Sequence, residues 1–275
     1  MKHLYLLMIV ISIIGCSPKE QEKTQEPAET KIQLTTNYGE ILLKLYNETP
    51  LHRDNFTKIV HEGVLDSVLF HRVIEEFMIQ AGNPATKSEN VDSLYLENYN
   101  YRVPAEITAE LFHKKGALAA ARTGNPERES SGTQFYIVQG KIFNDSLLNN
   151  AEERINTWLS EHYIKQDSIY KNQLDSLNIA LENDNWEEFM RLNNFFVEKA
   201  KSYDNFEKYS IPEAHKTVYR SVGGTPHLDQ NYTVFGEVIS GLQVVDSIAS
   251  VVTNDRDRPI ENVRIIKAKV IKEKE

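Results

Sequence analysis

The stretch FHRVIEEFMIQAG, residues 70–82, places an arginine inside an apolar, strand-like run. A charged side chain on such a surface costs free energy unless it has a partner or a role in binding. Arg72 is therefore the first candidate functional residue. The structural alternative is that its long side chain follows the surface to solvent and pairs with Glu75 or Glu76.

Length and composition exclude several classes of function. The 275 residues suffice for one large domain or for a domain with an insertion. The net charge is -9 and no basic cluster follows a groove-sized face, so we expect no nucleic-acid partner. The eight histidines lack metal-ligand spacing, and neither HExxH nor CxxC occurs, so we expect no metal site. We expect a monomer.

The N-terminus has the pattern of an export signal. A short basic start precedes an apolar run over residues 4–14, which is too short to span a bilayer. The next feature, Ile13-Ile14-Gly15-Cys16, resembles a bacterial lipobox, which implies cleavage after residues 1–15 and lipidation of Cys16. Residues 16–30 then hold the lipidated cysteine and a flexible charged tether. We expect a lipid-anchored protein of the bacterial cell envelope. Because Ser17 rather than Asp follows the cysteine, we expect it at the outer membrane, facing the periplasm or the surface.

Two parts of the chain, residues 31–142 and 223–275, have the short alternating segments of a β-rich domain. Alternation predicts a hairpin over residues 32–45 and strands at 68–73, 77–81, 117–122, 134–139, 233–239 and 263–271. Helical spacing predicts helices over residues 51–62 and 241–249. The fold class that this favours is mainly β with α, as a closed antiparallel β-barrel capped by two helices.

Residues 143–222 have a different pattern, because apolar residues recur there at helical spacing among Asn, Glu, Lys and Asp. We expect an inserted α-helical subdomain. Two interpretations remain open: a solvated decoration of the barrel, or an arm that binds partners or client chains.

Four further blocks accompany residues 70–82: Asn55-Phe56 with Gly63, residues 103–106 with 113–122, residues 131–137, and residues 227–229 with 232–236. Together they resemble the cyclophilin-type peptidyl-prolyl cis–trans isomerases. The resemblance covers about residues 31–142 and 223–272, with the helical segment between. It implies a cyclophilin-like barrel, rotation of X–Pro bonds, proline-containing polypeptide clients and no cofactor.

The resemblance also implies a role for each matching residue. Arg72 matches the catalytic arginine. The positions expected at the substrate are Phe77, Met78, Gln80, Ala121, Arg122, Thr123, Gln134, Tyr136, His227, Leu228 and Tyr232. Among them, Phe77, Met78, Tyr136 and Leu228 line the proline pocket, Gln80 and Gln134 lie beside it, and the backbone of residues 121–123 holds the substrate chain. Since His227 replaces the tryptophan of drug-sensitive members, we expect weak cyclosporin binding.

These large apolar residues could instead belong to the core, and the two glutamines could have purely structural hydrogen bonds. Strand geometry raises a further question, because a flat strand over residues 77–81 would place Phe77 and Met78 on opposite faces. A bend or bulge near Glu76-Phe77 would reconcile the two positions with one pocket. By the same alternation, Phe135 should face the core while Tyr136 faces the pocket.

Rotation about an X–Pro bond breaks no covalent bond, so it needs no nucleophile. In the twisted transition state the proline nitrogen regains a lone pair, and a fixed donor aimed at it stabilises that state selectively. Arginine is always charged, and its fork could donate to this nitrogen while holding Gln80. The sequence thus predicts a prolyl isomerase acting on exported or unfolded chains. The alternative is a proline-segment binding module or holdase chaperone with the helical insertion as its partner-binding arm.

Overall fold

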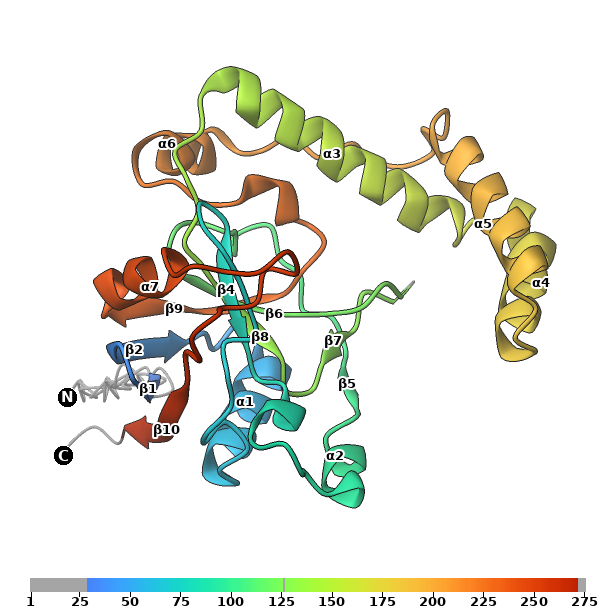
Figure 1. The fold of residues 1–275 in the computed structure, drawn as a ribbon. Helices are drawn as coiled ribbons and strands as arrows, with labels where there is room; N and C mark the ends of the chain where they lie inside the picture. Colours follow the sequence, from blue (N-terminus) through green and yellow to red (C-terminus); the bar gives the residue numbers. More distant parts are fainter. Residues whose placement is uncertain (1–28, 126, 272–275) are drawn as a thin grey trace, which may run out of the picture.

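The computed structural model describes residues 29–125 and 127–271 (Figure 1). Cys16 and the predicted signal and tether up to residue 28 lie outside the described residues. No helix within the described ranges has both the length and the apolar character needed to cross a membrane.

Eight strands form one antiparallel sheet in the order β10-β1-β2-β9-β6-β8-β4-β3, and β5 pairs with β7 separately. Their bounds are β1 Thr30–Thr36, β2 Gly39–Leu45, β3 Arg72–Ile74, β4 Met78–Ala81, β5 Arg102–Val103, β6 Ala117–Ala120, β7 Ser130–Ser131, β8 Phe135–Val138, β9 Val234–Ser240 and β10 Ile265–Ile271. The predicted hairpin is confirmed as β1 and β2, whose register pairs Thr36 with Gly39. Gly39 has φ 132°, and a Cβ there would approach Val244 to 2.9 Å.

The prediction of a closed barrel is wrong. The sheet curls into a half-barrel, and within the described residues no strand ladder joins its edge strands β10 and β3. The segment before β3 meets the start of β10 over a short stretch, where three backbone hydrogen bonds join residues 67–70 to residues 263–265 around an isolated bridge between Leu69 and Arg264. The edge strand β3 is short because the chain turns at Glu76, which has φ 59°. In addition, the backbone carbonyl of Asp257, in the loop before β10, accepts the Val73 N–H at 2.7 Å.

The described helices are α1 Pro50–His61, α2 Ser93–Asn98, α3 Asp145–Ile164, α4 Lys171–Glu182, α5 Trp186–Ala200, α6 Glu213–Ser221 and α7 Leu242–Ala249, with short 3-10 helices η1 Pro84–Thr86, η2 Ser168–Tyr170 and η3 Pro226–Leu228. Helices α1 and α7 match the two predicted capping helices. Both contribute to the core inside the curled sheet, through Phe56 and Ile59 of α1 and Val245 and Ile248 of α7.

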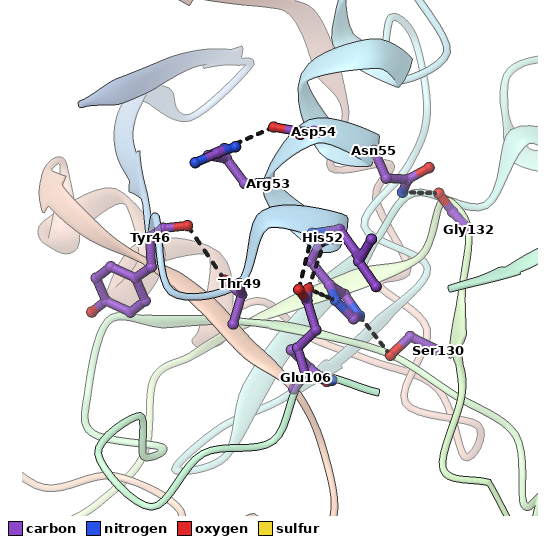
Figure 2. Close-up of polar contacts among 11 residues, drawn as sticks. Tyr46, Thr49, His52, Arg53, Asp54, Asn55, Glu106, Ser130 and Gly132 are labelled. Atoms are coloured by element: carbon purple, nitrogen blue, oxygen red, sulfur yellow. Dashed lines mark hydrogen bonds and ion pairs between the residues drawn. The ribbon is translucent and has the colours of Figure 1, made fainter. Parts of the chain in front are cut away.

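The first turn of α1 is held by a carboxylate from a distant loop (Figure 2). Glu106 accepts the backbone N–H groups of Leu51 at 3.0 Å and His52 at 2.9 Å, and it bonds His52 Nδ1 at 2.7 Å. On its other side, His52 Nε2 lies 3.0 Å from Ser130 Oγ. A negative charge at a helix N-terminus satisfies free N–H groups and complements the helix dipole. These bonds tie α1 to the segment around Ser130, which leads into β8.

Helices α3 to α6 occupy the region that the sequence predicts to be helical. Figure 1 shows α3 extending from the sheet region, with α4 and α5 at its far end. Two apolar clusters stabilise this helical segment. One joins α3 and α6 through Leu148, Ile155 and Tyr219, and the other joins α3, α4 and α5 through Ile164, Leu177 and Phe196. Its status as a subdomain inserted into the parent fold stays a prediction.

Candidate active site

A pocket of about 90 Å³ lies where β3, β4, β8 and the segment after β6 meet η3. Its lining residues are Arg72, Phe77, Met78, Gln80, Ala121, Arg122, Tyr136, Leu228 and Tyr232. Each was expected at the substrate site from the sequence. Most of the wall is apolar or aromatic, with the arginines and the glutamine as polar groups, which is the usual composition of a small-ligand site.

A larger hollow of about 500 Å³ adjoins this pocket and shares Gln80, Ala121 and Arg122 with it. Thr123 and Gln134 line the larger hollow. His227 lines neither, and its ring instead stacks on Phe77, with centroids 5.5 Å apart. The structure therefore groups the predicted residues around two joined hollows, with His227 behind one wall.

Strand register explains why these side chains meet. Gln80 on β4 lies opposite Arg72 on β3 and opposite Tyr136 on β8, so three predicted site residues form one row across the sheet. Met78 faces the same side as Gln80, whereas Ile79 points into the core.

The left-handed backbone of Glu76 supplies a bend, not a bulge, and leaves Phe77 in a turn before β4 begins. Phe77 can therefore join the pocket wall without following the alternation of the strand. Phe135 packs in the core and Tyr136 packs with the pocket residues, as alternation predicts.

Arg72 is anchored by a residue that the sequence analysis missed. Its Nε donates to Asp257 Oδ2 at 3.2 Å, and its side chain is 44% exposed. The structure thus replaces the suggested pairing with Glu75 or Glu76, and Glu76 pairs with Lys141 instead. Gln80, the expected partner of the arginine fork, donates to Gln134 Oε1 at 3.3 Å.

The segment after β6 is fixed by its neighbours. The Ala121 N–H donates to the Gln134 carbonyl at 2.9 Å, and the Ala121 carbonyl accepts the Ser131 N–H at 2.8 Å. Both backbone groups of Ala121 are therefore used within the fold.

Arg122 has a structural role as well. Its Nε donates to the Asn231 carbonyl at 2.9 Å, and its guanidinium lies 5.0 Å from the centre of the Tyr232 ring. Burial lowers the pKa of Arg122 from its usual value. Arg122 thus ties the segment after β6 to the chain around Tyr232 at the pocket wall.

Burial sets the protonation of Tyr136 in the pocket wall and of His227 behind it. It lowers the pKa of His227 to about 4, with the positive charge of Arg154 as a second cause, so this ring is neutral near pH 7. Burial raises the pKa of Tyr136 well above its usual value, so its hydroxyl keeps its proton.

The described residues contain no group of three or more His, Cys, Asp or Glu side chains that could hold a metal ion.

Comparison with known proteins identifies the family. The family model described as cyclophilin type peptidyl-prolyl cis-trans isomerase/CLD matches residues 31–165 and 193–270. The chain belongs to the cyclophilin-type peptidyl-prolyl cis–trans isomerases. The match passes over residues 166–192, which include η2 and α4.

Relatives of this cyclophilin-type chain are also named as peptidyl-prolyl cis-trans isomerases. One from Staphylococcus haemolyticus, "Putative peptidyl-prolyl cis-trans isomerase", is 27% identical and aligns with 86% of this chain and 89% of its own length. One from Streptococcus pyogenes serotype M6, "Putative bifunctional phosphatase/peptidyl-prolyl cis-trans isomerase", is 28% identical over 94% of this chain, which spans 43% of that longer protein. A crystal structure of a Cryptosporidium parvum cyclophilin-type isomerase has a TM-score of 0.52 at 16% identity and covers 90% of this chain and 100% of its own, which supports the fold.

Proposed function

We propose that the 90 Å³ pocket binds the proline ring of an X–Pro segment and that Arg72 donates a hydrogen bond to the proline nitrogen as the bond twists. The observation that carries this proposal is the composition of the pocket: one half-exposed arginine lies beside Phe77, Met78 and Leu228. The apolar groups suit a pyrrolidine ring, and the arginine is the donor that the twisted nitrogen needs.

Asp257 supports this role by orienting Arg72. Its bond to Nε fixes the plane of the guanidinium and leaves the terminal nitrogens of the fork as donors for the substrate. A charge-assisted hydrogen bond contributes about 1.5–3 kcal/mol, and each 1.4 kcal/mol changes a rate about tenfold. This single contact is therefore worth on the order of 10- to 100-fold in rate.

The test is X–Pro isomerisation of a short peptide by the full-length chain in mild detergent. Arg72→Ala should lower kcat/KM by on the order of 10- to 100-fold without changing the unfolding temperature, since the side chain is half exposed. Asp257→Asn should cost only a few-fold, because the donor remains but is less well oriented. Arg53 is a matched control: on α1 its Nε donates to Asp54 Oδ1 at 2.7 Å (Figure 2), and it lines neither hollow.

Arg53→Ala should leave turnover unchanged. Equal turnover by wild type and Arg72→Ala would contradict the mechanism. A folded wild-type chain that binds proline peptides without isomerising them would instead favour the binding-module interpretation.

We further propose that the clients are exported or unfolded chains that the protein meets at a membrane, to which it is anchored through Cys16. The support is the lipobox-like sequence before Cys16 and the charged residues that follow it. Fractionation of the producing cells tests the anchor: the wild type should remain with the membranes, and Cys16→Ser should not. A Cys16→Ser variant that stays on the membranes would contradict it.

A further inference from the structure

A buried chain of hydrogen bonds extends from the pocket wall into the helical segment. The Tyr136 hydroxyl lies 2.9 Å from His113 Nε2, and His113 Nδ1 lies 2.8 Å from Asp229 Oδ1. The second oxygen of Asp229 accepts the hydroxyl of Tyr219 at 2.7 Å. Each of these side chains is 4% exposed or less.

The order of donors along this chain follows from its chemistry. Asp229 Oδ1 also accepts the His113 backbone N–H at 2.9 Å, so His113 Nδ1 faces an acceptor and carries a proton. The Tyr136 hydroxyl keeps its proton and donates to Nε2 in the tautomer that carries the ring proton on Nδ1. The hydrogen bonds thus fix the position of the Tyr136 ring, and Tyr136 lines the pocket.

The far end of the chain belongs to another part of the molecule. Tyr219 lies on α6, where it packs with α3, whereas Asp229 directly follows the pocket residue Leu228. A second contact runs the same way, because Trp158 of α3 packs against the apolar cluster that contains Tyr136 and Leu228. The pocket wall is therefore held in part by the helical segment.

We propose that Tyr219 is a positioning residue for the isomerase pocket, which it acts on through Asp229, His113 and Tyr136. The inference rests on the proposed function, since it requires the 90 Å³ pocket to be the site of turnover. Loss of the Tyr219 hydroxyl leaves one oxygen of the buried Asp229 without that donor, so Asp229 and His113 shift and the Tyr136 ring loses its fixed place. The helical segment then has a specific effect on catalysis rather than being only a surface decoration.

The test combines Tyr219→Phe with Tyr136→Phe in the full-length chain and measures kcat/KM on an X–Pro peptide. A typical hydrogen bond is worth about 1 kcal/mol, so Tyr219→Phe should lower kcat/KM by about fivefold. In the Tyr136→Phe background the same change should have less than about a twofold effect, because the last link of the chain is already absent.

Tyr203→Phe is the matched control. Its hydroxyl also donates to a carboxylate, Asp167 Oδ2 at 3.0 Å, and both residues lie in the distal part of the helical segment. Turnover by Tyr203→Phe should match the wild type.

Unchanged turnover in Tyr219→Phe would overturn the proposal, as would the same fivefold loss in both backgrounds, which is what general loosening of α6 would produce. Arg72→Ala, measured in the same assay, separates a failure of the proposed site of turnover from a failure of the positioning role of Tyr219. If Arg72→Ala shows its expected loss of turnover and Tyr219→Phe is fully active, only the positioning role fails. If Arg72→Ala is fully active, the site of turnover itself is wrong.

Discussion

The sheet region and the helical segment are stabilised in different ways. The sheet region has one large cluster, to which residues far apart in the chain contribute, such as Ile32 and Ile265, and a smaller one at the pocket that contains Tyr136 and Leu228. The helical segment has two smaller clusters, and several large apolar side chains of α4 and α5 stay exposed, among them Ile179, Trp186 and Met190. The comparison suggests a cooperative sheet region that carries the pocket and a segment whose far end can open separately.

The largest expected effect is the loss of stability when a buried phenylalanine of either region is replaced by alanine. Phe135 on β8 and Phe196 on α5 are both 1% exposed, and Phe→Ala at either costs about 3–5 kcal/mol of unfolding free energy. Phe135→Ala should lower hydrogen-exchange protection across the sheet and reduce turnover, since Tyr136 follows it on the strand. Phe196→Ala should lower protection only in α4, α5 and the end of α3.

Hydrogen exchange read by mass spectrometry on the full-length chain, together with the X–Pro assay, checks both variants. If Phe196→Ala lowers hydrogen-exchange protection in the sheet as much as in the helical segment, the two regions form one cooperative unit and the comparison fails.

An intermediate effect is the pH dependence of stability that His227 causes where the two regions meet. His227 on η3 contacts Phe77 of the sheet region and is influenced by Arg154 of α3. Its pKa is about 4 in the folded chain and near 6.5 when unfolded, so below about pH 6.5 the unfolded state binds a proton that the folded state does not. Stability attributable to this ring is therefore complete above that pH and falls as pH drops toward 4.

Between about pH 7.5 and pH 5 the loss from His227 should be about 2 kcal/mol, measured as the change in the free energy of urea unfolding. His227→Gln should lose that much less stability over the same interval. His61→Gln, an exposed histidine on α1, is the control and should keep the wild-type pH dependence. An identical pH dependence for His227→Gln would show that this ring is not the group that resists protonation.

The smallest effect concerns cyclosporin. We propose that it binds weakly because the position held by tryptophan in drug-sensitive cyclophilins is His227. His227→Trp should strengthen inhibition of X–Pro turnover by on the order of tenfold, since a buried indole contact is often worth 2 kcal/mol or more. Strong inhibition of the wild-type chain at low cyclosporin concentration would contradict the premise, and an unimproved variant would indicate that the surroundings of η3 deny the drug access.

Local pattern explains what the sequence predicts well. The β1–β2 hairpin, α1 and α7 follow from alternation or helical spacing, whereas the conflict between Phe77 and Met78 on one strand leaves open whether a bend or a bulge resolves it. The predicted strand over residues 68–73 is mostly not a strand, because only β3, from Arg72 to Ile74, finds a ladder partner.

Long-range partners are what the sequence cannot supply. Asp257 binds Arg72 across 185 positions, and its backbone carbonyl also accepts the Val73 N–H of β3. Local pattern could therefore predict neither the partner of Arg72 nor the failure of the sheet to close at β3. His113 and Asp229 lie within the matched blocks, yet their contact spans 116 positions and no spacing rule indicates it.

The placement of β1 between β2 and β10 has a consequence for the order of folding. Lys31, near the start of the described chain, pairs with Ile271 at its end, so the sheet is complete only after the last strand has left the ribosome. Contacts between such distant residues must close a long loop before they gain any stability, which slows folding. Until β10 arrives, the outer edge of β1 is unpaired and can associate with other chains, so the chain is vulnerable to aggregation during its own synthesis.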